Sequence, residues 1–174
     1  GWVNDVPIFG LDGLNIRKEG RTKLDTAIHI HLSRGQNKIQ VGVLNERLTK
    51  SLKETLFQTY IAAPAKPDLY IVAFGISEYQ EGGTSLQFPA KDAEWLPGRI
   101  KQLNYERGIY NQVHPLVLTN QEVNAGSMGQ ARKFLSNSQP DDVVLFFLSG
   151  HGQNSSVDRQ YYYLLSNYDG FESS

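Results

Sequence analysis

The stretch Val143-Val144-Leu145-Phe146-Phe147-Leu148, followed at once by Ser149-Gly150-His151-Gly152, decides the fold of this chain. Six apolar residues in a row predict a β-strand buried on both faces, the most buried strand of the chain. The two glycines allow a sharp turn and the close approach of another group. A histidine at the tip of such a strand is well placed for catalysis, because imidazole titrates near neutral pH and can take and return a proton. A structural turn histidine is the competing interpretation at this level.

Upstream and downstream of this stretch, from Asp68 onward, strand patterns alternate with helix patterns. The order β-α-β-α-β-β predicts an α/β fold with a mostly parallel sheet, right-handed crossovers and helices on its faces. Functional residues of such sheets gather at the carboxyl ends of the strands, where Ser149 to Gly152 would lie. Pro97 predicts a kink in the first helix or a late start of it. We expect strands at 69–76, 113–118, 143–148 and 161–165, and helices at 92–108 and 125–136.

Residues 1–64 have a different pattern, typical of an all-β region. Alternating stretches predict strands at 2–9, 27–32, 38–44 and 52–61, with a turn at 34–37. Because four such strands have one apolar face that needs a second layer, we interpret them as the C-terminal part of an immunoglobulin-like β-sandwich that begins upstream of Gly1. A short Pro/Ala linker at 62–67 separates this region from the domain at 65–174.

Composition narrows the chemistry of the 174 residues. The chain contains no cysteine, which excludes disulfides, thiolate metal sites and a thiol nucleophile within it, and either redox compartment fits, with the cytoplasm slightly favoured. A net charge of −1 gives no general attraction to nucleic acid or to an anionic membrane, so we expect neither as a partner. No apolar run approaches the roughly 20 residues that cross a bilayer. His29 and His31 would share a strand face, but without an evident third ligand we predict no metal site.

A series of motifs between residues 68 and 169 resembles a known family. Leu-Gln-Phe-Pro-Ala-Lys-Asp-Ala at 86–93 opens the first helix, and Leu-Thr-Asn at 118–120 precedes the second. Asp141-Asp142 leads into the strand that ends in Ser-Gly-His-Gly, and Tyr-Tyr-Leu-Leu-Ser-Asn-Tyr-Asp follows at 162–169. In this order and spacing, the series is similar to the large-subunit portion of caspase-like cysteine peptidases, closest to the bacterial metacaspase or orthocaspase type. The resemblance implies a caspase-like three-layer sandwich with a mostly parallel sheet, preceded here by the partial β-sandwich.

The resemblance also implies roles for four residues. His151 would be the catalytic histidine, and Gly152 would lend its backbone N–H to an oxyanion hole. Asp92 matches the acidic residue of the metacaspase S1 pocket, and Ser149 matches another residue of that pocket. A carboxylate there favours Arg or Lys at the cleaved position, and residues 84–87 lack the arginine that Asp-specific caspases carry. The competing interpretation of Asp92 is a helix N-terminal residue stabilised by the helix dipole.

The chain departs from the family because the nucleophilic cysteine is missing. In caspases the histidine precedes that cysteine by about 50 residues, so we expect the cysteine beyond Ser174, in a C-terminal portion that would be this chain's partner. Cleavage after Ser174 during maturation, a sequence cut short, and a natural pseudo-peptidase all remain open. The predicted function is the histidine-bearing part of an endopeptidase that cleaves proteins or peptides after Arg or Lys. The alternatives are a catalytically inactive caspase-like interaction module and a flavodoxin-like ligand-binding domain, for which Ser77-Glu78-Tyr79 is a poor phosphate loop.

Two loops have weaker signals. Asp141 and Asp142 could contribute to a calcium site, as in metacaspases that need calcium, but a solvated loop before a strand is the competing interpretation. We therefore predict no resident cofactor. The glycine-bearing loop at 79–84 lies at the functional edge of the predicted sheet and could border a substrate.

Overall fold

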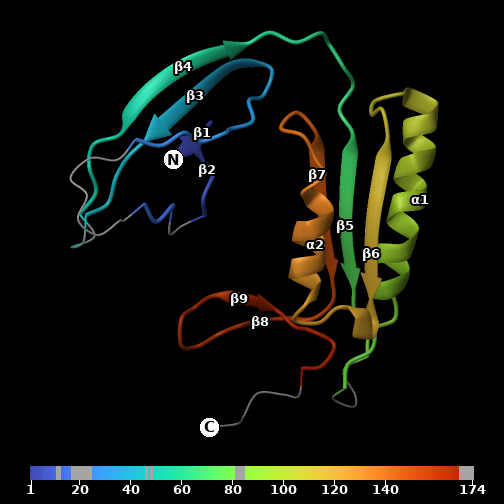
Figure 1. Ribbon diagram of the computed structural model, residues 1–174. Helices are drawn as coiled ribbons and strands as arrows, with labels where there is room; N and C mark the ends of the chain where they lie inside the picture. Colours follow the sequence, from blue (N-terminus) through green and yellow to red (C-terminus); the bar gives the residue numbers. More distant parts are fainter. Residues whose placement is uncertain (11–12, 17–24, 46, 48, 81–84, 169–174) are drawn as a thin grey trace. The chain divides into compact units, whose positions relative to one another are not determined.

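The computed structural model describes residues 1–10, 13–16, 25–45, 47, 49–80 and 85–168 (Figure 1). The chain divides into two compact units, Gly1–Pro64 and Ala65–Ser174, which we describe separately. Among the described residues, no helix has the length and apolar character needed to span a bilayer.

The first unit contains four strands, β1 (Trp2–Val3), β2 (Val6–Pro7), β3 (Gly35–Val41) and β4 (Glu54–Tyr60). They form one antiparallel sheet in the order β2-β1-β3-β4. β1 and β2 make a tight hairpin because Asn4 and Asp5 both adopt positive φ, as a two-residue type I′ turn requires. The Asn4 side chain accepts a hydrogen bond from the Lys38 backbone N–H at 2.9 Å, which ties this hairpin to β3.

The strand expected at 27–32 was a wrong prediction. These residues have no regular secondary structure, and the expected turn at 34–37 lies largely inside β3. The physical reason is the fully buried Asn37 side chain, which accepts a hydrogen bond from the Ser33 N–H (3.0 Å) and donates one to the Ser33 carbonyl (2.7 Å). This anchor holds the backbone before β3 in a bend. His29 and His31 therefore lie exposed on an irregular segment and do not share a strand face.

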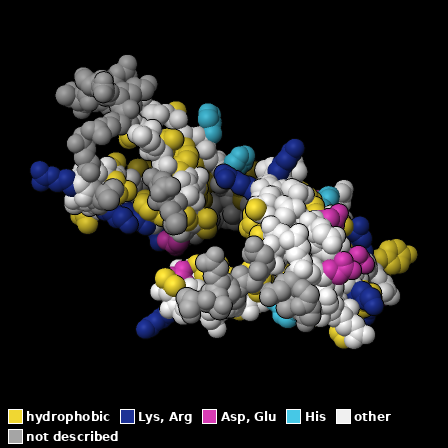
Figure 2. Space-filling view, turned by 90° about the horizontal axis from the view of Figure 1, so that it is seen from below, with side chains coloured by type: hydrophobic (Ala, Val, Ile, Leu, Met, Phe, Trp, Pro, Cys, Tyr) yellow, Lys and Arg dark blue, Asp and Glu magenta, His cyan; other side chains and the backbone are white. Residues whose placement is uncertain are grey.

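Apolar side chains of this sheet are exposed to solvent. Leu56 and Phe57 on β4 are 61% and 59% exposed, and hydrophobic side chains reach the molecular surface in Figure 2. Successive residues of a strand point to opposite faces, so each face of the sheet has an uncovered apolar side chain. Within the described part of the chain, the first unit is thus a single antiparallel sheet without the second layer of a sandwich.

The second unit is built on a three-stranded parallel sheet with the order β6-β5-β7. The register aligns Gly75, Thr119 and Ser149, so the carboxyl ends of the three strands lie level at one edge of the sheet. An antiparallel hairpin of two further strands follows the sheet. The elements are β5 (Leu69–Gly75), α1 (Pro89–Arg107), β6 (Val113–Thr119), η1 (Asn120–Glu122), α2 (Ser127–Leu135), β7 (Val143–Ser149), β8 (Gly152–Asn154) and β9 (Tyr161–Tyr163).

The two helices cover opposite faces of the parallel sheet. From the central strand β5, Ile71 and Ala73 pack with Ala93 of α1, whereas Val72 and Phe74 point the other way and pack with Ala131 of α2. The chain crosses from β5 to β6 and then back past β5 to β7, and right-handed crossovers in opposite directions place the helices on opposite faces. The prediction of an α/β unit with a parallel sheet packed against helices is confirmed.

Three details of the second unit differ from the predictions. β7 was expected to be the most buried strand, but it is an edge strand in the described sheet, with Phe146 and Leu148 45% and 52% exposed, while β5 is buried throughout. The strand expected at 161–165 does not join the parallel sheet, because β9 pairs antiparallel with β8. α1 begins at Pro89, earlier than the expected residue 92, since proline is tolerated in the first helical turn, and it continues through Pro97.

Gly75 is required where α1 meets the end of β5. A Cβ atom at this position would overlap the Pro89 carbonyl oxygen and lie 2.8 Å from the Ala93 Cβ. We therefore expect Gly75→Ala to destabilise the protein by about 3 kcal/mol, measured by urea unfolding, because backbone rather than a movable side chain must give way. Gly98→Ala is the matched control, since a Cβ there meets nothing within 4 Å beyond its own helix backbone and chain neighbours, and alanine favours a helix. Equal stabilities of the two variants would contradict this packing.

Candidate functional site

The backbone of His151 is held by a tyrosine that follows the neighbouring strand of the sheet. The His151 N–H donates a hydrogen bond to the Tyr79 hydroxyl at 2.7 Å, and the two rings lie 5.1 Å apart at an angle of 51°. Tyr79 follows β5, whereas His151 follows β7, so this bond joins the ends of two neighbouring strands. It fixes the tip of β7 on which the histidine sits.

Ser149 and Gly150 complete this tip. The Ser149 carbonyl accepts hydrogen bonds from the Ile76 N–H (2.9 Å) and the Tyr163 hydroxyl (2.8 Å). A Cβ at Gly150 would lie 2.7 Å from the Tyr79 hydroxyl and 3.1 Å from that of Tyr163. Gly150 is therefore the residue that lets both tyrosines close on the backbone next to the histidine.

Gly152 begins β8, and the hairpin register sets the direction of its backbone N–H. The Leu164 N–H donates to the His151 carbonyl at 3.0 Å, and Gly152 pairs with Tyr163 in the same ladder. In an antiparallel ladder this makes Gly152 a member of a non-hydrogen-bonded pair, so its N–H points away from β9. A Cβ at Gly152 would overlap the Tyr161 hydroxyl, which adds a second requirement for glycine here.

Asp92 reaches the same edge of the sheet from another element. It lies exposed in the first turn of α1, and its N–H donates to the Phe88 carbonyl at 2.9 Å. This helix start is anchored to the chain after β5, because the Ala90 N–H donates to the Ser77 hydroxyl at 3.1 Å. Of the four predicted site residues, three thus lie within the four residues 149–152 at the end of β7, and Asp92 lies on the helix that starts after the end of β5.

The surroundings of Tyr79 and Tyr163 favour the protonated hydroxyl of each. Burial raises the pKa of Tyr163 well above its usual range, and the neighbouring Tyr79 and Tyr161 hydroxyls add to the shift. Burial also raises the pKa of Tyr79, partly offset by the hydrogen bond from the His151 N–H. Both hydroxyls therefore stay protonated to a higher pH than an exposed tyrosine does, and they act as neutral hydrogen-bonding groups beside the histidine.

These raised values predict a loss of stability in alkali. The folded state holds the Tyr163 proton more tightly than the unfolded state, so its contribution is fully present below about pH 10 and is lost as the pH rises further. We expect the free energy of unfolding to fall between pH 9 and about 11 by less in Tyr163→Phe than in the wild type, measured by urea unfolding at each pH. Tyr105→Phe, at an exposed tyrosine of α1, should behave as the wild type. An unchanged pH dependence in Tyr163→Phe would refute this role of burial.

A polar cluster that the sequence did not predict lies at the opposite, amino edge of the sheet. The His114 Nε2 lies 2.8 Å from the Asp68 Oδ2, and the His114 ring stacks on Tyr70 with the centroids 4.7 Å apart. The hydrogen bond from His114 lowers the pKa of the Asp68 carboxyl, with Asn111 as a further donor. No short motif links these residues, because they lie 46 positions apart in sequence. Their position at the start of two apolar strands was the one available signal.

The Asp141–Asp142 loop has a structural explanation at the same edge. Asp142 accepts hydrogen bonds from the backbone N–H groups of Asp68 and Gln139, both at 2.8 Å. The carboxylate thus holds the entry of β7 against that of β5. Across the described residues, no group of three His, Cys, Asp or Glu side chains is arranged to hold a metal ion, at this loop or near His29 and His31.

Two predicted features fall partly outside the described residues. Residues 81–84 of the glycine-bearing loop and Asp169 at the end of the family-like segment belong to these undescribed parts. The flanking Gln80 N–H donates to the Ser166 carbonyl at 3.0 Å, so the start of this loop contacts the segment after β9. No family model, curated protein or solved structure matches the chain.

Proposed function

We propose that residues 68–169 are the histidine-bearing part of a caspase-like cysteine endopeptidase that cleaves proteins or peptides after Arg or Lys. The nucleophilic cysteine would come from sequence beyond Ser174. The finer fold belongs to the same proposal: a caspase-like three-layer sandwich, preceded by the last strands of an immunoglobulin-like β-sandwich.

The observation that carries the proposal is the geometry at the tip of β7. His151 lies at the carboxyl end of a parallel strand, and its backbone is fixed by the Tyr79 hydroxyl at 2.7 Å. The adjacent Gly152 N–H points away from the hairpin ladder and so is available to another group. A base and an oxyanion donor on adjacent residues are what acyl transfer by a thiol needs.

The reaction would run in four proton and bond transfers. His151 would take the proton of the cysteine thiol, and the thiolate would attack the peptide carbonyl. The Gly152 N–H would stabilise the negative oxygen that forms, and His151 would return the proton to the leaving amine. Water would then release the acyl group from sulfur by the same proton route. Asp92 and Ser149 would hold the Arg or Lys side chain before the cleaved bond.

The outer edge of β7, which no described strand covers, is consistent with a parallel sheet that continues with a further strand. Phe146 and Leu148 on β7 are about half exposed, although the strand consists almost wholly of apolar residues. A strand of this composition is stabilised by a neighbour and a covering layer. We assign both to the cysteine-bearing portion of the same protein, which would bring its nucleophile to the carboxyl edge next to His151.

The test uses the longer protein that contains this chain and the sequence beyond Ser174. Intact mass under denaturing conditions, with and without iodoacetamide, establishes whether a reactive thiol is present. Capped fluorogenic peptides ending in Arg, Lys or Asp then measure cleavage. We expect a reactive thiol and hydrolysis after Arg and Lys but not after Asp. A thiol without any hydrolysis would favour the inactive interaction module, and a longer protein without cysteine would exclude the peptidase.

A further inference from the structure

We propose that the β8–β9 hairpin binds an extended peptide segment along the outer edge of β8 and takes one uncharged apolar side chain of that segment into an adjoining pocket. The proposal rests on the proposed function only in choosing a polypeptide as the ligand. The residues that line the pocket have no role in the peptidase assignment, and only Gly152, at the start of the β8 edge, belongs to both proposals.

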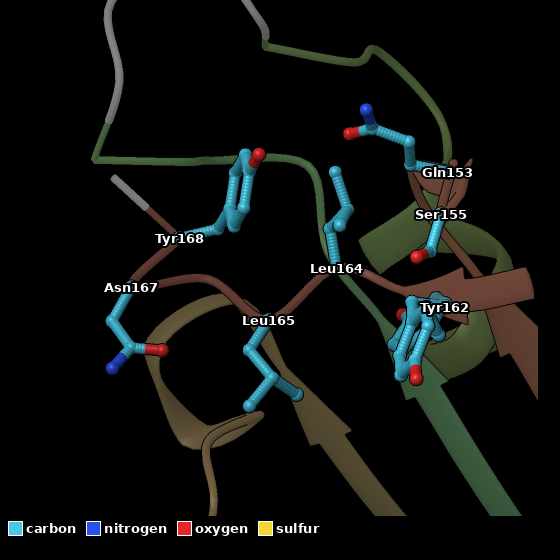
Figure 3. Close-up of a pocket in the computed structure, with 8 residues that line it drawn as sticks. Gln153, Ser155, Tyr162, Leu164, Leu165, Asn167 and Tyr168 are labelled. Carbon is cyan, nitrogen blue, oxygen red and sulfur yellow. The ribbon is translucent and has the colours of Figure 1, made fainter. Parts of the chain in front are cut away.

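The pocket has a volume of about 400 Å³, within the range of small-ligand sites. Tyrosine rings and leucines form most of its walls, and two amides and a hydroxyl add polar groups. None of these side chains is charged at neutral pH, which favours a neutral occupant with apolar surface, because a charge would be buried unpaired. The lining residues are Gln153, Ser155, Tyr162, Tyr163, Leu164, Leu165, Asn167 and Tyr168 (Figure 3).

Two side chains of the pocket wall, Tyr162 and Leu165, are held by contacts within the protein. The Tyr162 hydroxyl donates to the Asp158 Oδ2 at 2.5 Å, and the Asp158 Oδ1 accepts from the Gln160 N–H at 3.1 Å. Leu165 packs against the core on the α2 side of the sheet. In Figure 3, Leu164 and Tyr168 extend to one side of the segment after β9, and the Gln153 side chain extends to the same side. A pre-formed pocket lowers the entropic cost of binding.

The outer edge of β8 offers backbone groups for strand addition. Among the described residues, β8 pairs only with β9. The hydrogen bonds from Leu164 N–H to the His151 carbonyl and from Ser155 N–H to the Gln160 carbonyl fix the register. In this register the N–H and C=O groups of Gly152 and Asn154 face away from β9. An extended peptide can pair with these groups, the mode of recognition known as β-augmentation.

The edge and the pocket belong to the same short strand. Gln153 and Ser155 point into the pocket, and they alternate with Gly152 and Asn154, whose backbone groups form the edge. A peptide paired with this edge would direct every second side chain to the pocket side of the hairpin. The edge starts next to His151, so such a segment would pass the candidate catalytic residue. The expected ligand is therefore an extended segment with a Phe-like or Leu-like residue.

The experiment records ¹H–¹⁵N spectra of the 174-residue chain during titration with acetyl-Ala-Phe-Ala-amide. We expect dose-dependent shifts at Gly152, Asn154 and Leu164, whereas resonances of β5 should stay in place. Acetyl-Ala-Asp-Ala-amide should bind about tenfold more weakly, since its carboxylate would lose water without gaining a partner.

Two variants test the contributions of the pocket and of the β8 edge to binding separately. Gln153→Trp should fill the pocket and abolish the shifts, and Gln130→Trp on the exposed surface of α2 is its matched control. Asn154→Pro removes one outward N–H without breaking the β8–β9 ladder, and it should weaken binding by about fivefold, the effect of one lost hydrogen bond. Unchanged β5 resonances show that each variant is folded.

Absent shifts at the hairpin at millimolar peptide would overturn the proposal, as would binding that Gln153→Trp leaves unchanged. Equal binding of the Phe and Asp peptides would also overturn it. The chain contains no cysteine, so these results do not depend on whether the longer protein cleaves peptides. The hairpin can therefore fail as a binding site while the peptidase assignment stands. Equally, the peptidase assignment can fail while the hairpin binds peptide.

Discussion

Replacing His151 with alanine is expected to lower kcat/KM of the longer protein for an Arg peptide by at least about 1,000-fold, with little change in stability. The imidazole would be the group that takes and returns the proton, and no other histidine of the described second unit lies at this edge of the sheet. Its backbone N–H, which bonds Tyr79, is unaffected by the substitution. Steady-state rates on a capped fluorogenic peptide measure the effect, and urea unfolding measures the stability.

His31→Ala is the matched control for this prediction. His31 is exposed on an irregular segment of the first unit, so its loss should leave kcat/KM within about twofold of the wild type. A His151→Ala protein that retained more than a tenth of the wild-type rate would remove His151 from the reaction. The candidate site would then be a structural turn at the end of β7.

Asp92→Asn is expected to cost about 100-fold in kcat/KM for an Arg peptide, equivalent to about 3 kcal/mol. The reason is that an amide replaces a carboxylate where the proposal places the guanidinium of the substrate, and a charge-assisted bidentate pair becomes a neutral contact. The loss for a Lys peptide should be similar in direction, and the substrate preference should broaden toward uncharged residues. The measurement compares kcat/KM for otherwise identical Arg, Lys and Gln peptides.

Glu94→Gln provides the matched charge removal two positions further along α1, on an exposed side chain. It should leave the preference for Arg intact. If Asp92→Asn and Glu94→Gln reduced the rate equally, the effect would come from the general negative field of the helix start and not from a specific pocket. If neither reduced it, Asp92 would be a helix N-terminal residue with no part in substrate binding.

Sequence patterns predicted the second unit well because the residues of each segment largely determine its secondary structure. Leu69–Gly75 is a continuous apolar run and becomes the central strand, and the helices at 89–107 and 127–135 lie close to the predicted ranges. The order of these elements was enough for the α/β arrangement, because parallel strands need crossover helices.

The errors arose where neighbours, rather than the segment itself, decide the structure. Apolar composition predicted burial of β7, but burial depends on a strand at its outer edge, and the described residues supply none. The alternation at 27–32 suggested a strand, but the buried amide of Asn37 holds the adjacent chain in a bend. Tyr161 to Leu165 had strand composition, and only the tight return through Asp158 explains why it pairs with β8.

The sequence predicted the site residues that are neighbours in the chain, but not the contacts between residues far apart in the chain. Ser149, His151 and Gly152 are neighbours in sequence, so their common position follows from the strand that carries them. Tyr79 is 72 residues from His151, and nothing in its own surroundings indicates that its hydroxyl binds the histidine backbone. The same holds for Asp68 and His114, which meet only because β5 and β6 are adjacent.

The outer edge of β7 also has a consequence for the behaviour of the protein in solution. The seven residues from Val143 to Ser149 contain no charge, no proline and no glycine, and the described residues leave one side of their backbone unpaired. Such an edge is a template on which the same strand of a second molecule can add, the first step of ordered aggregation. Self-association of this chain through β7 is therefore expected to increase with protein concentration.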